Sequence, residues 1–250
     1  MSALFPRWSN SFSRTTLLVA VSVPAVAIGA LLAFARSPFV TQQNVQLEQP
    51  IQFDHRHHVG DEGIDCRYCH NSVEKASSAG IPPTQICMNC HAQVWNKSPL
   101  LDQVRAHYFS DTPIAWNRVH NLPDYVYFNH SIHVNKGVGC ETCHGRMDQM
   151  PIAEKASPMT MSWCLDCHRN PVPNLRPREA ITSMGWEPLT GHPAGQVTTA
   201  STPTEHAAAT AGAGPDHAAA DSAGDRKRYQ EALAQDYNVA ARVNCTTCHR

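Results

Sequence analysis

The chain has 250 residues, enough for one or two domains, and its 20 basic and 21 acidic residues leave a formal charge of −1. This balance, without any basic cluster, excludes nucleic acid as an expected partner. Aromatic residues make up only 7% of the chain, and there are 18 prolines. Because such a sequence buries little apolar surface by itself, we expect bound groups to supply much of the interior.

Residues 1–14 are polar, and residues 15–35 form an uncharged apolar run about as long as a bilayer core is thick. We expect a single-pass transmembrane anchor over 15–35, with Pro24 tolerated inside it. A cleaved signal peptide is the alternative, since Ala33–Ala35 could serve as a cleavage site. Arginines before the run place the N-terminus in the cytoplasm, so the rest of the chain is expected on the periplasmic side of the cytoplasmic (inner) membrane.

The sequence Cys-x-x-Cys-His occurs five times and uses all ten cysteines. Two thiols at this spacing reach the two vinyl groups of one porphyrin, and the histidine that follows reaches the iron from one side. A redox-active cysteine pair or a zinc site would not need that histidine in every copy. The motif therefore predicts five covalently attached haem c groups. The sites are Cys66, Cys69 and His70 (site 1), Cys87, Cys90 and His91 (site 2), Cys140, Cys143 and His144 (site 3), Cys164, Cys167 and His168 (site 4), and Cys245, Cys248 and His249 (site 5).

An internal repeat surrounds the first four sites. The pattern Phe-x-His-x-x-His-Val precedes site 1 at residues 53–59 and site 3 at residues 128–134, and each copy continues through a second site. Such self-similarity indicates duplication of a two-haem unit. We call residues 53–91 module 1 and residues 128–168 module 2, and expect both within a four-haem domain spanning 37–180.

A low-spin haem needs a second ligand on the face opposite its motif histidine. The histidines of the repeated pattern are the best candidates, because a pair at i, i+3 projects two imidazoles from one helical turn. They are His55, His58, His130 and His133. For the fifth haem, which lacks such a pair, His120 is the first choice, with Met161 and Met150 as alternatives. The choice matters because His/Met ligation raises a haem potential, whereas bis-histidine ligation favours lower values.

The last part of the chain differs in composition. Residues 190–223 are rich in alanine, threonine, glycine and proline, which is typical of a flexible linker. Residues 224–250 are expected to form a helix that leads into site 5. The fold class predicted for the whole chain is mainly loops with short α-helices wrapped around five c-type haems, a multihaem cytochrome, plus one N-terminal transmembrane helix.

From Phe53 to Pro177 the chain resembles the pentahaem cytochrome subunit, ActA, of alternative complex III, a quinol:cytochrome c oxidoreductase. The similarity lies in residues 63–70, 81–84, 116–124, 128–140 and 163–170, and the N-terminal span and residues 244–250 also look like that family. The resemblance implies an electron-transfer subunit rather than an enzyme. It implies an iron–sulfur subunit and multi-span quinol-oxidising membrane subunits as partners, with a monohaem cytochrome c subunit beside them. Electrons would leave to a cytochrome c, a high-potential iron–sulfur protein or a terminal oxidase.

Two other functions remain open from the residues alone. One anchor and several haems also fit a stand-alone membrane quinol dehydrogenase that feeds a periplasmic reductase. A multihaem enzyme would need an iron with an open coordination site. All five motifs are regular and histidines are in surplus, so we assign no catalytic residue.

Overall fold

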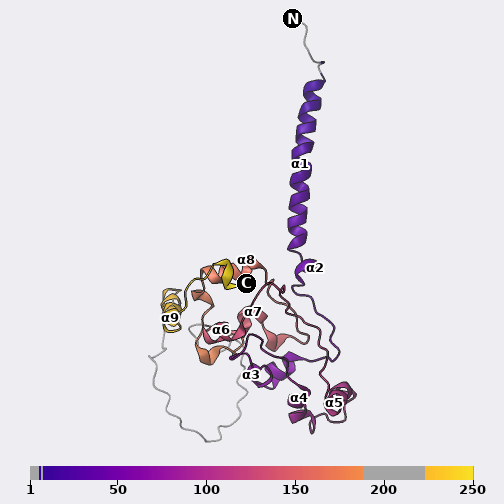
Figure 1. Cartoon of the computed structure of the whole chain (residues 1–250), viewed down its shortest axis with the longest axis vertical. Coiled ribbons are helices and arrows are strands. Elements are labelled where there is room, and N and C mark those ends of the chain that lie inside the picture. The colour runs from indigo at the N-terminus through magenta and orange to yellow at the C-terminus, as the bar shows by residue number, and fades with distance from the viewer. Residues whose placement is uncertain (1–5, 7, 188–222, 250) are drawn as a thin grey trace. The chain divides into compact units, whose positions relative to one another are not determined.

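A computed structural model of the chain describes residues 6, 8–187 and 223–249 (Figure 1). The predicted linker at 190–223 lies outside the described residues, except for its last residue. Two compact units divide the chain between Val45 and Gln46. Each unit is described by itself.

The N-terminal unit is dominated by α1 (Ser9–Ala35), followed by the single turn α2 (Pro38–Thr41). Helix α1 is long and apolar enough to cross a membrane, and none of its side chains is buried. It begins at Ser9, ahead of the apolar run at 15–35 from which an anchor is expected. Aromatic side chains lie at both of its ends, Trp8 beside Phe12 and Phe34 beside Phe39, as at membrane–water interfaces.

The second unit consists of short helical segments joined by loops, with no strand among the described residues. The segments are η1 (Arg56–Asp61), α3 (Cys66–Cys69), α4 (Thr84–His91), η2 (Pro99–Leu101), α5 (Asp102–Phe109), α6 (His130–Asn135), α7 (Cys140–His144), η3 (Met147–Gln149), α8 (Met161–Arg169), η4 (Val172–Asn174), η5 (Arg178–Ala180), α9 (Ala223–Asp236) and η6 (Cys245–Thr247). Segments α3, α4, α7, α8 and η6 carry the five attachment motifs. A helical turn brings cysteines three positions apart onto one side, which suits both to the same edge of a ring.

The two modules interlock through their backbones. In module 1, the Arg56 amide donates to the Met150 carbonyl, which follows site 3 (3.1 Å). In module 2, the amide of Ser131 donates to Ala76 and that of His130 to Ser77, both of which follow site 1 (3.1 Å each). Each histidine-bearing turn is therefore seated on the loop after the other module's first site.

The histidine-bearing turns differ in winding because their sequences differ in length. Eight positions separate His58 from Cys66, but only seven separate His133 from Cys140. Segment η1 is a π-helix, whereas α6 is an α-helix. The wider π turn absorbs the additional residue of module 1 and keeps its second histidine in register with that of module 2.

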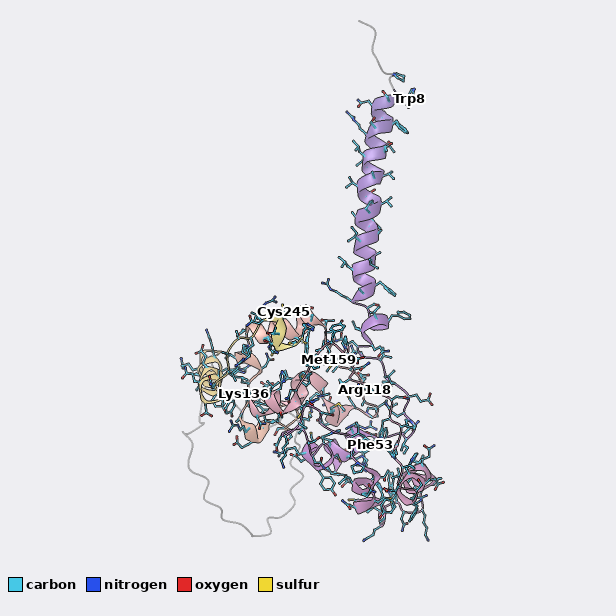
Figure 2. All side chains as sticks on the ribbon, viewed as in Figure 1. Trp8, Phe53, Arg118, Lys136, Met159 and Cys245 are labelled. Carbon is cyan, nitrogen blue, oxygen red and sulfur yellow. The ribbon has the colours of Figure 1, made fainter. Side chains whose placement is uncertain are left out.

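The C-terminal part packs through α9 against η4, which follows module 2. The Lys136 ammonium donates to the carbonyl of Tyr237, the residue after α9 (2.6 Å), and Figure 2 labels Lys136 beside this helix. The Arg178 amide donates to the Tyr237 hydroxyl (3.2 Å), while its guanidinium lies 4.7 Å from the ring centre. Gln230 adds a bond to the Pro173 carbonyl (2.8 Å). Site 5 is thereby held against the rest of the unit.

The apolar core of this unit is small. Its buried apolar side chains are those of Ile51, Val73, Val104, Leu175, Ala180, Ile181, Met184, Ala234 and Tyr237. Of these, Leu175 is the most deeply buried, at 1% exposed. A protein unit of this size ordinarily buries far more apolar surface, so the protein alone does not fill its interior.

Candidate functional site

The attachment sites follow one another in an order that differs from the sequence. The Cys66 thiol of site 1 and the Cys140 thiol of site 3 are neighbours, and their interaction raises the pKa of Cys66 and lowers that of Cys140. On the other side of site 1, burial and then the charge of the nearby Cys87 raise the pKa of Cys69. Site 1 therefore lies between site 2 and site 3.

The row continues through sites 4 and 5. Burial raises the pKa of Cys143 to about 12, and the nearby Cys167 and Cys164 of site 4 add to the effect. Burial also raises the pKa of Cys164, and the next contribution comes from Cys248 of site 5. All ten thiols are free, as attachment to haem requires. The sites thus form the row 2, 1, 3, 4, 5.

Each motif histidine has its Nδ1 atom in a hydrogen bond. At sites 1, 2, 4 and 5 the acceptor is a backbone carbonyl, of Gly80 for His70 (2.7 Å), Val94 for His91 (3.1 Å), Arg242 for His168 (3.0 Å) and Tyr125 for His249 (3.0 Å). A ring that donates from Nδ1 leaves the lone pair of Nε2 for a metal. These four histidines are therefore oriented to ligate through Nε2.

The predicted second ligands face motif histidines of their own module. Ring centres are 6.1 Å apart for His58 and His91, 6.0 Å for His133 and His168, and 6.3 Å for His130 and His144. The fourth candidate, His55, lies near enough to His70 of site 1 to feel its charge, since burial and then the charge of His70 lower the pKa of His55 to about 4. Each repeated histidine pair is therefore positioned to serve both sites of its module.

These distances fit a haem iron between the rings. Two metal–nitrogen bonds of about 2 Å each, plus about 1 Å from each nitrogen to its ring centre, separate the centres by about 6 Å. Three of the four candidate ligands also donate from Nδ1 to a carbonyl, His58 to Asp54 (2.8 Å), His130 to Ser77 (2.8 Å) and His133 to Asn129 (2.7 Å), which again leaves Nε2 for the metal. The small core and the donor set together fit covalently bound haem, although the ligand assignments themselves stay predictions.

The structure places His120 beside site 3 rather than site 5. Its Nε2 atom lies 3.2 Å from Nδ1 of His144, with the ring centres 4.3 Å apart. Burial, followed by the charge of Lys155, lowers the pKa of His120 to about 4, so the ring is neutral near pH 7. Since its Nε2 is already engaged, this position does not favour the predicted role as second ligand of the fifth haem.

Around site 5 the structure offers fewer candidate ligands. The ring of Tyr125 lies 5.8 Å from that of His249. Met161, at the start of α8, is 63% exposed and belongs to the helix whose Cys164 neighbours site 5. Met150 instead lies near Gly145, just after site 3. Of the two methionines, Met161 therefore has the better position, and its ligand role remains a prediction.

Residues that support the motif helices were not expected from the sequence. Asp65 caps α3 by accepting from the Arg67 amide (2.8 Å), and the Arg67 side chain holds the pKa of this carboxyl down, to about 2. At site 3 the buried Arg176 donates to the Ser183 carbonyl (2.9 Å) and lies 3.7 Å from Glu141. An aspartate directly before the first cysteine is a signal for a cap, but no sequence pattern indicates the Arg176 contacts.

Two comparisons agree with this geometry. The family model for cytochrome c7 and related cytochrome c matches residues 51–104 and 126–184. The multiheme cytochrome c subunit of menaquinone reductase from Nitratidesulfovibrio vulgaris (strain Hildenborough) is 36% identical over 120 residues, which is 48% of this chain and 56% of the relative. The chain thus spans about half the length of the curated relative that it matches. The second unit is a multihaem cytochrome c domain, and the matched family implies covalently bound haem c.

Proposed function

We propose that the chain carries five c-type haems and conducts electrons as a subunit of a quinone-linked membrane complex. Haem iron, when bound, supplies a one-electron couple. The observation that carries the proposal is the single row of attachment sites, whose neighbouring thiols link site 2 to site 5 through sites 1, 3 and 4. A row of this kind suits transfer between two distant partners.

The residues of the chain hold, orient and shield the cofactors in this proposal. The cysteine pairs fix the porphyrin edges, and the motif histidines ligate from one side with their Nδ1 atoms hydrogen-bonded. The histidine pairs of 53–59 and 128–134 ligate from the other side. Each pair joins the two haems of one module, which keeps neighbouring cofactors at a fixed separation.

Alternative complex III is the assembly that we propose first. The partners would be an iron–sulfur subunit, multi-span quinol-oxidising membrane subunits and a monohaem cytochrome c subunit, with a cytochrome c, a high-potential iron–sulfur protein or a terminal oxidase as acceptor. Helix α1 would anchor the chain in the cytoplasmic membrane, with the haems on the periplasmic side. Support comes from the motifs at 116–124 and 128–140 and from the apolar character of α1.

A second assembly is favoured by the sequence comparison. The similar protein of Nitratidesulfovibrio vulgaris is a subunit of menaquinone reductase. In such a complex, electrons would travel along the same row of sites toward the quinone instead of away from it. Both assemblies would use the same row of attachment sites, and they differ in the direction of net electron transfer.

Purification from native membranes in mild detergent tests both levels of the proposal. Haem per chain is measured first, by the pyridine haemochrome spectrum and intact mass, and five are expected. A reduced menaquinone analogue should then reduce the haems, and added cytochrome c should reoxidise them. Rapid reduction of oxidised menaquinone by the prereduced complex, without oxidation of menaquinol, would favour the reductase instead. A chain with fewer than five haems, or one that purifies without membrane partners, contradicts the proposal.

A further inference from the structure

Site 3 differs from the other four sites in the group that orients its motif histidine. At sites 1, 2, 4 and 5, that histidine donates to a peptide carbonyl. At site 3, His144 Nδ1 lies 3.2 Å from Nε2 of another imidazole, that of His120. The partner at this site is a side chain, so it can be changed without altering the backbone.

The direction of this hydrogen bond follows from the ligand role of His144. A neutral imidazole that gives Nε2 to a metal carries its proton on Nδ1 and must donate from there. His120 therefore accepts through Nε2 and carries its own proton on Nδ1. Both tautomers follow from the chemistry of ligation through Nε2.

The same geometry separates His120 from the ligands proper. Its ring centre is 4.3 Å from that of His144, too close for an iron between the rings, whereas His130 stands at 6.3 Å on a nearly parallel ring. Its ring lies at 73° to that of His144, edge to face. His120 is therefore placed to act on His144 and not on the metal.

The loop that carries His120 is fixed to the segment before module 1. Gln49 and Asn117 form a reciprocal pair. The side-chain amide of Gln49 donates to the backbone carbonyl of Asn117 (3.0 Å), and the backbone amide of Asn117 donates to Gln49 Oε1 (2.9 Å). The Asn117 side chain also donates to the Glu48 carbonyl. These contacts hold the chain three residues before His120, so the acceptor is presented at a defined position.

An imidazole nitrogen is a stronger base than a peptide carbonyl. A stronger acceptor draws the Nδ1 proton further from His144, makes that ring a better electron donor to a metal, and favours the oxidised iron. Groups of this kind, in contact with a ligand rather than with the metal, are an established means by which proteins tune a metal site. Site 3 lies in the middle of the row, so its potential affects every transfer between the two ends.

We propose that His120 is a positioning residue for site 3, which fixes the ring of His144 and lowers the potential of the haem attached there. The inference rests on the proposed function, because it requires a haem at Cys140 and Cys143. It assigns His120 a role at site 3 in place of a ligand role at site 5.

The test uses the full chain with its haems and compares three variants. His120→Leu removes the acceptor, His120→Gln offers an amide oxygen in its place, and His107→Leu is the matched control. His107, on α5, forms a hydrogen bond with the Thr112 hydroxyl (2.9 Å). Among the described residues it has no hydrogen bond to a motif histidine. Haem content, the low-spin optical and electron paramagnetic resonance spectra, and a potentiometric titration are recorded for each.

We expect five low-spin haems in every variant. In His120→Leu, one of the five potentials should become more positive, and in His120→Gln the shift should be smaller. His107→Leu should titrate like the wild type. A purely structural role would not move a single potential while the spectra and haem content stay unchanged.

Other outcomes overturn the inference in distinguishable ways. Unchanged potentials in both His120 variants remove the tuning role. A high-spin haem in His120→Leu identifies His120 as an axial ligand instead. If the leucine variant does not load haem, His120→Gln decides alone, and the absence of any shift in it counts against the inference. A wild-type chain with fewer than five haems defeats the proposed function itself.

Discussion

Modules 1 and 2 place their ligands alike and support them differently. His58 and His133 bond the carbonyl four residues earlier, and both stand about 6 Å from the motif histidine of their module's second site. The other histidine of each pair differs. His130 donates from Nδ1 to the Ser77 carbonyl, whereas Nδ1 of His55 is buried and has no hydrogen-bond partner in the part of the chain that the structure describes. The two modules thus share the arrangement of their predicted iron ligands, while the contacts around those ligands differ.

The positions just before sites 1 and 3 show the same divergence. Asp65 caps α3 with its side chain, while its counterpart Gly139 has none. Gly139 instead leaves room for the Arg176 guanidinium, which a Cβ atom would overlap. One module uses a polar cap at this position, and the other uses the space to bury an arginine.

Removing either second histidine should have the largest effect, and the same effect in both modules. His133→Ala and His58→Ala should each open one iron, because no other imidazole of the described residues stands opposite that motif histidine. We expect one high-spin haem in five, binding of added cyanide or imidazole, and slowed electron transfer along the row. Optical and electron paramagnetic resonance spectra measure this, with His107→Ala as control. An unchanged low-spin spectrum would disprove the ligand assignment.

Gly139→Ala should have the next largest effect, and it tests a contact that module 1 lacks. The new methyl group would displace the buried Arg176 from the Ser183 carbonyl and from Glu141. Overpacking of this kind costs about 1–3 kcal/mol. The free energy of unfolding, from urea titration followed by circular dichroism, should fall by that amount. Most of the loss should disappear when Arg176→Ala is already present, and an equal loss in both backgrounds would contradict the assigned contact.

Asp65→Ala should cost less, about 1 kcal/mol, which is typical for a lost N-terminal cap. The change removes the acceptor of the Arg67 amide and its ion pair at 2.9 Å. The same urea titration measures it. Asp61→Ala, at an exposed carboxyl without a capping role, is the matched control and should stay within about 0.5 kcal/mol of the wild type. A cost equal to that of the control would argue against the cap.

The smallest expected effect is a difference in acid stability. The Arg67 side chain lowers the pKa of Asp65 from 3.8 to about 2, so the folded state favours the ionised carboxylate. This contribution is fully present above the unfolded value and is lost as the pH falls from about 4 to about 2. Unfolding midpoints of the wild type and Asp65→Asn should therefore converge over that range. A constant difference down to pH 2 would contradict the shift.

The sequence predicts the parts of this molecule that repeat or follow a fixed spacing. The five motifs and the two histidine pairs indicate a multihaem domain with short helices. The structure and the match to the cytochrome c7 family model confirm this prediction. The start of α1 at Ser9 gives no such signal, because the residues from Ser9 to Arg14 are polar apart from Phe12. The π-helix is visible only as one additional residue before Cys66.

The contacts that orient the ligands lie beyond sequence reasoning. Every residue has a backbone carbonyl, so the sequence does not distinguish Gly80 and Val94 as the acceptors for His70 and His91. The position of His120 depends on where the loop between the modules runs, which spacing does not encode. The row of sites depends on the interlock at Met150 and Ser77, and those are again backbone contacts.

The bonds between sites 4 and 5 have a consequence for biogenesis. His168 donates from Nδ1 to the Arg242 carbonyl, and the Arg242 amide donates to the His168 carbonyl. At site 5, His249 donates from Nδ1 to the Tyr125 carbonyl, and the Tyr127 amide donates to the Cys248 carbonyl. A chain made from its N-terminus presents site 4 to the haem-attachment machinery long before Arg242 has been synthesised. Haem at site 4 could therefore be attached early, but His168 takes its final orientation only when the segment around Arg242 docks. Maturation of site 4 would be completed by residues synthesised 74 positions later.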